Sequence, residues 1–362
     1  MKSTAMVLTA FGRKLEQKEI EIPQLREGEI LVKITAAGVC GSDLHMFKGN
    51  DPRTPLPIIL GHEGVGEIIE IKGKRFSVDQ EELKSGDYII WNRGVSCGHC
   101  YYCAVVGTPA LCPRRWVYGI TKPCDQRPYL NGCYAEYIIL SPDTDIFKLP
   151  PDIDPAIIVS ASCSGATAAH CFDYVKPRTG DVVLIQGPGP LGIFAAYFAS
   201  LHGAGEIIMI GGTDKRLEMA KKFGVTTVLN RKHTSEEQRK EIIKELTGGR
   251  GVDYAIEAVG TAAAVKEGLS LVRTGGIYLS AGFGDPNGSV EVDCFCDIVR
   301  KNLTYQGIWV SDTRHTRMAL QGVLRNPSLF ETLVSHRLPL VEANLALTLM
   351  DQKKAVKAVL IP

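Results

Sequence analysis

The sequence predicts an α/β protein that combines a doubly wound parallel sheet domain with a β-rich domain. The chain has 362 residues, which is more than one hydrophobic core usually organises. Its first 151 residues contain extended apolar runs with no long helical period. Residues 182–280 instead alternate strand-like and helix-like segments at the spacing of parallel strands joined by crossover helices.

The β-rich pattern occupies the first part of the chain. Segments 29–35, 64–71 and 87–91 are apolar, extended and separated by glycine and charged turns. We therefore expect a small, irregular, barrel-like domain over residues 1–160.

The alternating pattern follows a helical region at 156–175. Predicted strands are 182–185, 207–210, 226–229, 254–256, 277–280 and 303–310, and predicted helices are 191–201, 215–223, 235–246 and 262–272. This pattern assigns the sheet domain to residues 161–305. The remaining segment, 306–362, has a helical pattern at 316–324 and is too short to form a domain of its own.

Composition excludes several classes of function. The formal net charge is +1, from 41 Lys and Arg against 40 Asp and Glu, with no basic block that would indicate a nucleic-acid partner. The most apolar stretch, 182–201, is interrupted by glycines and prolines, which argues against a membrane span. Eleven cysteines and no evident signal peptide favour reduced thiols, metal ligation and a cytoplasmic location.

A glycine-rich turn marks a dinucleotide site. Gly187, Gly189 and Gly192 form G-x-G-x-x-G directly after a predicted strand, and Pro190 and Leu191 begin the next helix. This context lets a pyrophosphate approach the backbone and face the positive end of the helix. The alternative is a structural turn in a domain that binds no nucleotide.

Four cysteines have the spacing of a closed zinc site. Cys97, Cys100 and Cys103 follow C-x2-C-x2-C, and Cys112 comes after a short loop. Four thiolates at this spacing can enclose one tetrahedral zinc ion that does no chemistry. Incidental clustering and redox thiols are the alternatives, and a zinc-ribbon nucleic-acid module is disfavoured by the balanced charge.

A second group of metal-binding residue types lies upstream. Cys40, Ser42, Asp43 and His45 fall within six residues, and His62-Glu63 stands between glycines at a strand junction. Together with the motifs above, these stretches resemble the zinc-dependent medium-chain dehydrogenases, the superfamily of alcohol, sorbitol and threonine dehydrogenases. The resemblance implies a Rossmann domain, a GroES-like catalytic domain, and a C-terminal segment that returns to the catalytic domain.

The resemblance also implies roles for individual residues. The catalytic zinc ligands would be Cys40, His62 and Cys163, with a buried structural cysteine as the alternative for Cys163. Asp43 would orient His62, and Glu63 would support the site, with the option of moving onto the metal. Ser42 and His45 would relay the alcohol proton to solvent. Cys112 lies one residue beyond the usual interval of the family.

The choice of cofactor departs from the family pattern. The acid that receives the ribose of NAD is replaced by Gly211, so charge no longer excludes NADP. Thr213, Lys215 and Arg216 follow and can receive a 2′-phosphate, whereas Asp214 is the alternative ribose acceptor. We expect NAD or NADP, with NADP favoured. Trp309 is assigned to the cofactor site by the resemblance.

The resulting hypothesis is a zinc-dependent alcohol dehydrogenase with one catalytic and one structural Zn²⁺. It would transfer hydride reversibly between NAD(P) and a small alcohol, polyol or functionalised hydroxy compound, as a homodimer or homotetramer. The alternatives are a zinc-free quinone or enone reductase on the same fold and a non-enzymatic nucleotide-binding protein.

Four cations are candidates for receiving an anionic substrate group, or else are solvated charges: Lys48, Arg93, Arg114 and Arg115.

Overall fold

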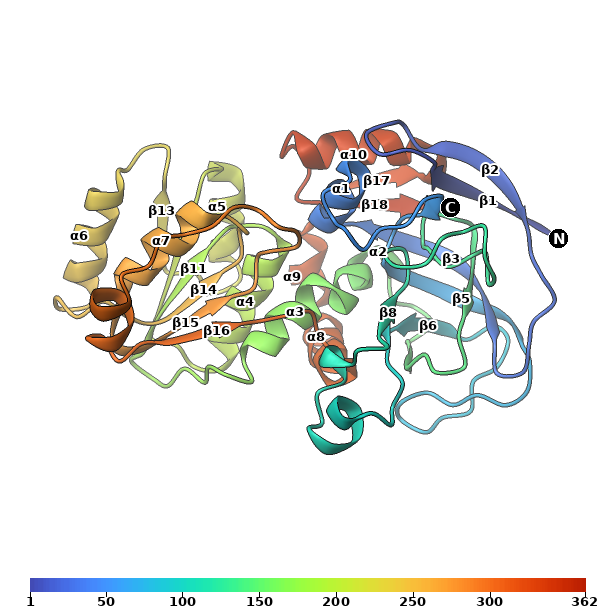
Figure 1. Ribbon diagram of the computed structural model, residues 1–362, viewed down its shortest axis with the longest axis horizontal. Coiled ribbons are helices and arrows are strands. Elements are labelled where there is room, and N and C mark those ends of the chain that lie inside the picture. The colour runs from blue at the N-terminus through green and yellow to red at the C-terminus, as the bar shows by residue number, and fades with distance from the viewer. The chain divides into compact units, whose positions relative to one another are not determined.

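The computed structural model describes residues 1–362 and contains two compact units (Figure 1). The first comprises Met1–Cys163 and Asp312–Pro362, and the second comprises Ser164–Ser311. The second unit is therefore inserted, in sequence, into the first. The α/β fold class predicted from the sequence is confirmed.

The second unit is built on a six-stranded sheet with the order β13-β12-β11-β14-β15-β16, in which every neighbouring pair is parallel. The strands are β11 (Val182–Gln186), β12 (Glu206–Gly211), β13 (Thr227–Asn230), β14 (Val252–Glu257), β15 (Val272–Ser280) and β16 (Thr304–Gly307). In chain order this is the 3-2-1-4-5-6 arrangement of the Rossmann fold, which binds ligands beyond the carboxyl ends of the strands where the order reverses. Here that point lies between β11 and β14.

Helices connect these strands in the second unit (Figure 1). They are α3 (Ser164–Cys171), α4 (Pro190–Leu201), α5 (Asp214–Lys221), α6 (Glu236–Leu246), α7 (Ala262–Leu271) and the short turn η4 (Cys294–Val299). Local sequence fixes their starts: the Ser235 side chain accepts the Gln238 backbone N–H at α6, and that of Thr261 accepts the Ala264 N–H at α7.

The first unit contains a seven-stranded sheet with the order β10-β6-β5-β3-β18-β17, and β9 also pairs with β3. The strands are β3 (Ile30–Val39), β5 (Glu63–Ile71), β6 (Tyr88–Trp91), β9 (Tyr137–Leu140), β10 (Ile146–Lys148), β17 (Val334–Pro339) and β18 (Lys357–Ile361). The register places Gly38 opposite both Glu63 of β5 and Val359 of β18. The C-terminal segment thus completes the sheet that the N-terminal segment begins.

Smaller elements complete the first unit. Its other strands are β1 (Lys2–Leu8), β2 (Glu16–Glu21) and β4 (Ile58–Ile59), which form one sheet, and β7 (Gly94–Val95) and β8 (Trp116–Val117), which form another. Its helices are α1 (Gly41–Lys48), α2 (Pro155–Ile158), α8 (Thr313–Arg325), α9 (Pro327–Glu331) and α10 (Ala343–Asp351). Short helical turns are η1 (Tyr101–Val105), η2 (Pro109–Leu111), η3 (Val159–Ser162) and η5 (Leu340–Glu342).

The helical region expected at 156–175 is present but interrupted, and the strand expected at 303–310 is shorter than expected. The helical region at 156–175 is three segments, α2, η3 and α3, because Cys163 has non-helical backbone angles, φ −125° and ψ −87°. The strand at 303–310 is reduced to β16, and Val310 has a φ of 51°, which is incompatible with an extended strand. No helix of the chain combines the length and the apolar character that crossing a membrane requires.

Candidate metal and nucleotide sites

Cys40, His62 and Cys163 are brought together by the first unit. Cys40 follows β3 and precedes α1, and His62 directly precedes β5. Because β3 and β5 are antiparallel, with Gly38 opposite Glu63, the end of one strand meets the start of the other. Cys163 comes from the break after η3. The ligand atoms of these three residues and Glu63 all lie within 4.8 Å of one another.

The distances between these atoms match a zinc site. The Sγ atoms of Cys40 and Cys163 are 3.8 Å apart, and His62 Nε2 lies 3.3 Å from Cys163 Sγ. Zinc–sulfur bonds of ~2.3 Å and zinc–nitrogen bonds of ~2.0 Å at tetrahedral angles give edges of roughly 3.8 and 3.5 Å. Two thiolates and one imidazole at these separations fit Zn²⁺, and Glu63 is a further potential ligand beside them.

A buried carboxylate fixes the orientation of His62. Asp43 is fully buried and accepts His62 Nδ1–H at 3.1 Å, the Tyr134 hydroxyl at 3.0 Å and the Cys40 backbone N–H at 2.8 Å. With Nδ1 held by the carboxylate, Nε2 is the nitrogen that faces Cys163. This is the carboxylate–histidine arrangement that selects one tautomer for a metal ligand.

Glu63 is held by a lysine at the far end of the sequence. Lys357 Nζ lies 2.9 Å from Glu63 Oε1 and 2.7 Å from Oε2, and both side chains are at most 1% exposed. A Cβ at Gly38 would lie 2.2 Å from Glu63 Oε2, so only glycine leaves room for this carboxylate. Burial opposes the charge on Lys357, but the proximity of Glu63 more than offsets it and raises the lysine pKa.

The two thiols of this cluster differ in acidity. The hydrogen bond with Cys163 lowers the pKa of Cys40 well below its usual range, and the same contact raises the pKa of Cys163. Two thiolates this close repel each other, so they share one proton unless a cation neutralises both. A divalent metal supplies that cation, which is a second sign that the donor set fits zinc.

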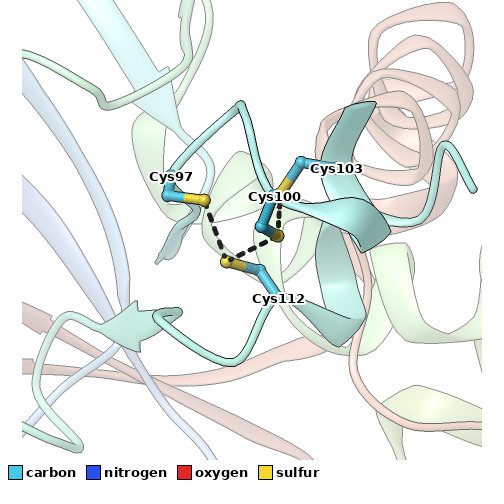
Figure 2. Close-up of side chains that lie close together, drawn as sticks. All are labelled: Cys97, Cys100, Cys103 and Cys112. Atoms are coloured by element: carbon cyan, nitrogen blue, oxygen red, sulfur yellow. Dashed lines mark hydrogen bonds between the residues drawn. The ribbon is translucent and has the colours of Figure 1, made fainter. Parts of the chain in front are cut away.

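The second cluster comprises Cys97, Cys100, Cys103 and Cys112, whose side chains point toward one another (Figure 2). Consecutive Sγ–Sγ distances are 3.6 Å for Cys97 and Cys112, 3.8 Å for Cys100 and Cys112, and 3.5 Å for Cys100 and Cys103. These are the edges of a small tetrahedron, as four thiolates around one zinc require. We call residues 97–112 the cysteine lobe.

The thiols of the cysteine lobe also differ in pKa. Backbone N–H donation, from His99 above all, lowers the pKa of Cys97 to about 6. Desolvation and the neighbouring Cys100 raise the pKa of Cys103 to about 12. Without a cation, only part of the cluster ionises at neutral pH, and a dication favours the fully ionised form.

The glycine-rich turn has the geometry of a phosphate-binding loop. Gly187 has a φ of +110°, and a Cβ on Gly192 would lie 1.9 Å from the Gly187 carbonyl oxygen. A Cβ on Gly189 would meet nothing within 4 Å, so the backbone that precedes Pro190 and Leu191 at the start of α4 is open to a ligand. The residues present therefore fit a dinucleotide.

The residues around the predicted 2′-position lie at the ends of β12 and β13. Gly211 ends β12, and its carbonyl accepts the Arg231 N–H at 2.8 Å. Asp214 accepts a hydrogen bond from Asn230, while the Arg231 side chain lies 3.0 Å from the ideal Cβ position of Gly212. The sequence analysis did not identify Arg231. Its position directly after the third strand of the sheet could have indicated it.

The remaining predicted residues of the cofactor and relay sets are placed as follows. Thr213 precedes α5, which contains Lys215 and Arg216, and Trp309 is 44% exposed. Ser42 and His45 lie on α1, three positions apart and therefore on one face of the helix. Ser42 Oγ is 4.0 Å from Cys40 Sγ.

Comparison with known proteins agrees with this geometry. Residues 26–151 match the alcohol dehydrogenase GroES-like domain, and residues 190–325 match the zinc-binding dehydrogenase domain. An L-threonine 3-dehydrogenase of Bacillus velezensis is 32% identical over 100% of this chain and 99% of its own length. The chain belongs to the zinc-dependent medium-chain dehydrogenases.

Other members of the family show the range of this dehydrogenase fold. A 5-exo-hydroxycamphor dehydrogenase of Pseudomonas putida is 30% identical over 96% of this chain and 95% of its own. An alcohol dehydrogenase structure from Thermotoga maritima is 47% identical, covers 100% of both chains and has a TM-score of 0.96. A zinc-binding dehydrogenase candidate from Sinorhizobium meliloti, bound to NADP, is 26% identical over 100% of both chains with a TM-score of 0.85.

The dehydrogenase is therefore an oxidoreductase whose family uses zinc and a nicotinamide cofactor. Sequence reasoning did not identify Tyr134 or Lys357 as parts of the metal site. Their contacts with Asp43 and Glu63 span 91 and 294 residues, and no local motif marks either one.

Proposed function

We propose that this dehydrogenase is a zinc-dependent NAD(P) alcohol dehydrogenase that reversibly oxidises a small alcohol, polyol or functionalised hydroxy compound. The observation that carries the proposal is the three-ligand set Cys40, His62 and Cys163 at zinc distances with a fourth position free of a protein thiol. When bound, zinc polarises the alcohol oxygen as a Lewis acid and the nicotinamide accepts hydride.

The chain's own residues hold and orient the reacting groups. Asp43 keeps His62 Nε2 directed at the cluster, and Lys357 neutralises Glu63 and keeps it beside the ligands. Ser42 lies next to Cys40 and would accept the proton that leaves the substrate while its own hydroxyl proton moves on toward His45. His45, on the same face of α1, would pass that proton to solvent.

The cysteine lobe has a structural role in this proposal. Four thiolates complete the coordination of one zinc ion and leave no position for a substrate. The protein would then bind two zinc ions, one in each cluster. Elemental analysis of purified protein should give about two zinc atoms per chain.

We also propose that NADP is accepted and preferred. No carboxylate stands at the end of β12, where Gly211 is found, and the Asp214 carboxylate three residues later accepts a hydrogen bond from Asn230. Arg231, together with Thr213, Lys215 and Arg216 at the start of α5, offers donors for a 2′-phosphate. Changing Gly211→Asp should shift the ratio of kcat/KM toward NAD, and a wild-type preference for NAD above about a hundredfold, ~2.7 kcal/mol, would contradict the proposal.

The assembly that we propose is a homodimer or homotetramer. Strand β16 ends the parallel sheet, and Tyr305 on it is 47% exposed. An open sheet edge with an exposed aromatic side chain is a surface that a second copy can cover. Light scattering at micromolar concentration tests this, and a monomer would contradict it.

All eleven cysteines are free, which supports the proposed cytoplasmic location.

The decisive test of activity is a screen of alcohols and polyols with both nicotinamide cofactors. Zinc-replete protein should reduce the cofactor with at least one alcohol, and dialysis against a chelator should remove that activity. Reduction of quinones or enones by zinc-free protein, without alcohol oxidation, would instead establish the alternative reductase.

A further inference from the structure

Of the four cations that the sequence offers for an anionic substrate, the structure separates two from the others. Lys48 pairs with Asp351 at 2.6 Å on the surface. Arg114 is exposed and donates to Cys97 Sγ at 3.2 Å, so it belongs to the cysteine lobe. Arg93 and Arg115 remain: Arg93 is buried and Arg115 is half-buried.

Arg93 reaches the catalytic cluster directly. It is 6% exposed, and its Nη1 donates to Cys163 Sγ at 2.7 Å. Adding a zinc–sulfur bond of ~2.3 Å puts this guanidinium within roughly 5 Å of a metal held by Cys163. Arg93 is therefore close enough to touch a substrate whose hydroxyl occupies the open position.

The Arg115 side chain reaches back toward Arg93 along a short two-stranded ladder. Strands β7 and β8 are antiparallel, with Gly94 opposite Val117 and Val95 opposite Trp116, so the backbones of Arg93 and Arg115 leave the ladder at opposite ends. The Arg115 guanidinium crosses Gly94, where a Cβ would lie 1.9 Å from Nη2 and 2.2 Å from Cζ. A side chain at position 94 would displace this guanidinium.

The charge of Arg115 lacks a dedicated partner. Its Nη2 is shielded from solvent and makes no hydrogen bond. The carboxylate that acts on Arg115, Asp312, binds His315 at 2.9 Å, and the nearby cation Arg53 is paired with Asp51 at 2.6 Å. Burial, and then the like charges of Arg93 and Arg53, lower the pKa of Arg115 to about 9. A guanidinium nitrogen that is shielded from solvent without a partner is costly, and an anionic ligand would satisfy it.

We propose that Arg93 and Arg115 bind an oxyanion of the substrate, which makes the preferred substrate an acidic hydroxy compound. The anionic group would lie within a few bonds of the carbon that is oxidised, because Arg93 contacts a ligand of the catalytic cluster. Guanidinium forks bind carboxylate and phosphate equally through paired N–H donors. The inference rests on the proposed alcohol dehydrogenase function and specifies its substrate class.

The test compares neutral and acidic substrates of equal length. Zinc-replete protein is assayed with glycerol, glycerate and glycerol 3-phosphate, and with glucitol and gluconate, using both cofactors. At least one acid should exceed its neutral counterpart in kcat/KM, and the carboxylate and phosphate arms identify the anion. A charge-assisted hydrogen bond corresponds to about a tenfold to hundredfold preference.

Variants link that preference to the two arginines. Arg115→Met and Gly94→Ala should each abolish the preference for the acid while leaving oxidation of the neutral alcohol within a few-fold. Arg93→Lys should retain part of it, since the charge remains and the fork is lost. Arg317→Gln removes an exposed guanidinium that pairs with Asp79, and should change nothing.

A melting-temperature shift gives a readout that does not need turnover. Glycerate or glycerol 3-phosphate should stabilise the wild-type protein and not Arg115→Met. Preference for neutral alcohols, or an acid preference that survives both Arg115→Met and Gly94→Ala, overturns the inference and leaves the dehydrogenase function intact. If no alcohol of either kind is oxidised, the proposed function fails, and the melting shift still decides whether the anion site exists.

Discussion

The two cysteine-containing clusters lie in the same unit, but one has exposed neighbours and the other is buried. The cysteine lobe takes its donors from residues 97–112, and exposed side chains such as Tyr101 (65%) and Val105 (71%) accompany them. The other cluster takes its donors from β3, β5 and the break at Cys163, and His62 and Glu63 are fully buried. A local cluster can be rigid on its own, whereas the dispersed cluster depends on the whole unit and on buried polar neighbours.

The largest expected contrast comes from removing one ligand from each cluster. His62→Ala should eliminate turnover, beyond the ~10²–10³-fold that loss of a single transition-state hydrogen-bond donor costs. Cys100→Ser should lower the melting temperature and the zinc content while the folded fraction keeps its activity. Parallel assays of zinc content, melting and kcat check both, and equal loss of activity would show that the clusters are not functionally distinct.

A smaller effect separates proton release from metal binding. His45→Gln should slow alcohol oxidation at neutral pH by about 10²–10⁴-fold, as loss of a general base does. Raising the pH should restore part of the rate because hydroxide accepts the proton. Zinc content should stay unchanged, and a pH–rate profile identical to that of the wild type would exclude His45 from the relay.

At the buried cluster, protons should compete with zinc for His62. Burial opposes the charge on His62, but Asp43 stabilises it and raises the His62 pKa to about 9. The imidazolium must lose its proton to bind zinc, so affinity rises with pH until about 9. From pH 7 the gain from His62 alone is about a hundredfold, at 1.36 kcal/mol per pKa unit. Zinc affinities measured against a chelator test this, and a flat response would contradict it.

The smallest expected effect comes from changing Asp43, the carboxylate that orients His62. Asp43→Asn should weaken zinc binding or activity by about 10–100-fold, the usual effect of losing a carboxylate behind a histidine ligand. It should also reduce the rise of zinc affinity between pH 7 and 9, because the imidazolium loses its charged partner. Glu136→Gln, in which the changed carboxylate accepts the Thr4 N–H away from the metal, is the matched control.

The same contrast explains which parts of the site are readable from sequence. Cys97 to Cys112 and Gly187 to Gly192 are local motifs, so their spacing indicates their geometry before any fold is known. Lys357 reaches the Cys40–His62–Cys163 cluster because β18 pairs with β3. Tyr134 reaches it because its backbone N–H donates to the carbonyl of Leu60, two residues before His62. Chain topology, which composition and periodicity do not encode, places them there.

Local conformation limited the prediction in other places. The pattern at 156–175 predicts a helical region but does not locate its interruption at Cys163, where the backbone turns and the thiol reaches the cluster. Tertiary demands overrode helix propensity at a single residue. Among the four candidate cations, the sequence did not distinguish Arg115 from Arg114, because burial depends on the packing over Gly94.

The pairing of Glu63 with Lys357 has a consequence for the order of events during synthesis. The two residues are separated by 294 positions, and the whole second unit is translated between them. At 5–20 residues per second, the carboxylate waits roughly 15–60 s for its lysine. During this interval β3 lacks β18, while the cysteine lobe already has all of its thiols. If both clusters bind zinc as proposed, the cysteine lobe can bind its ion during synthesis, before the buried cluster is complete.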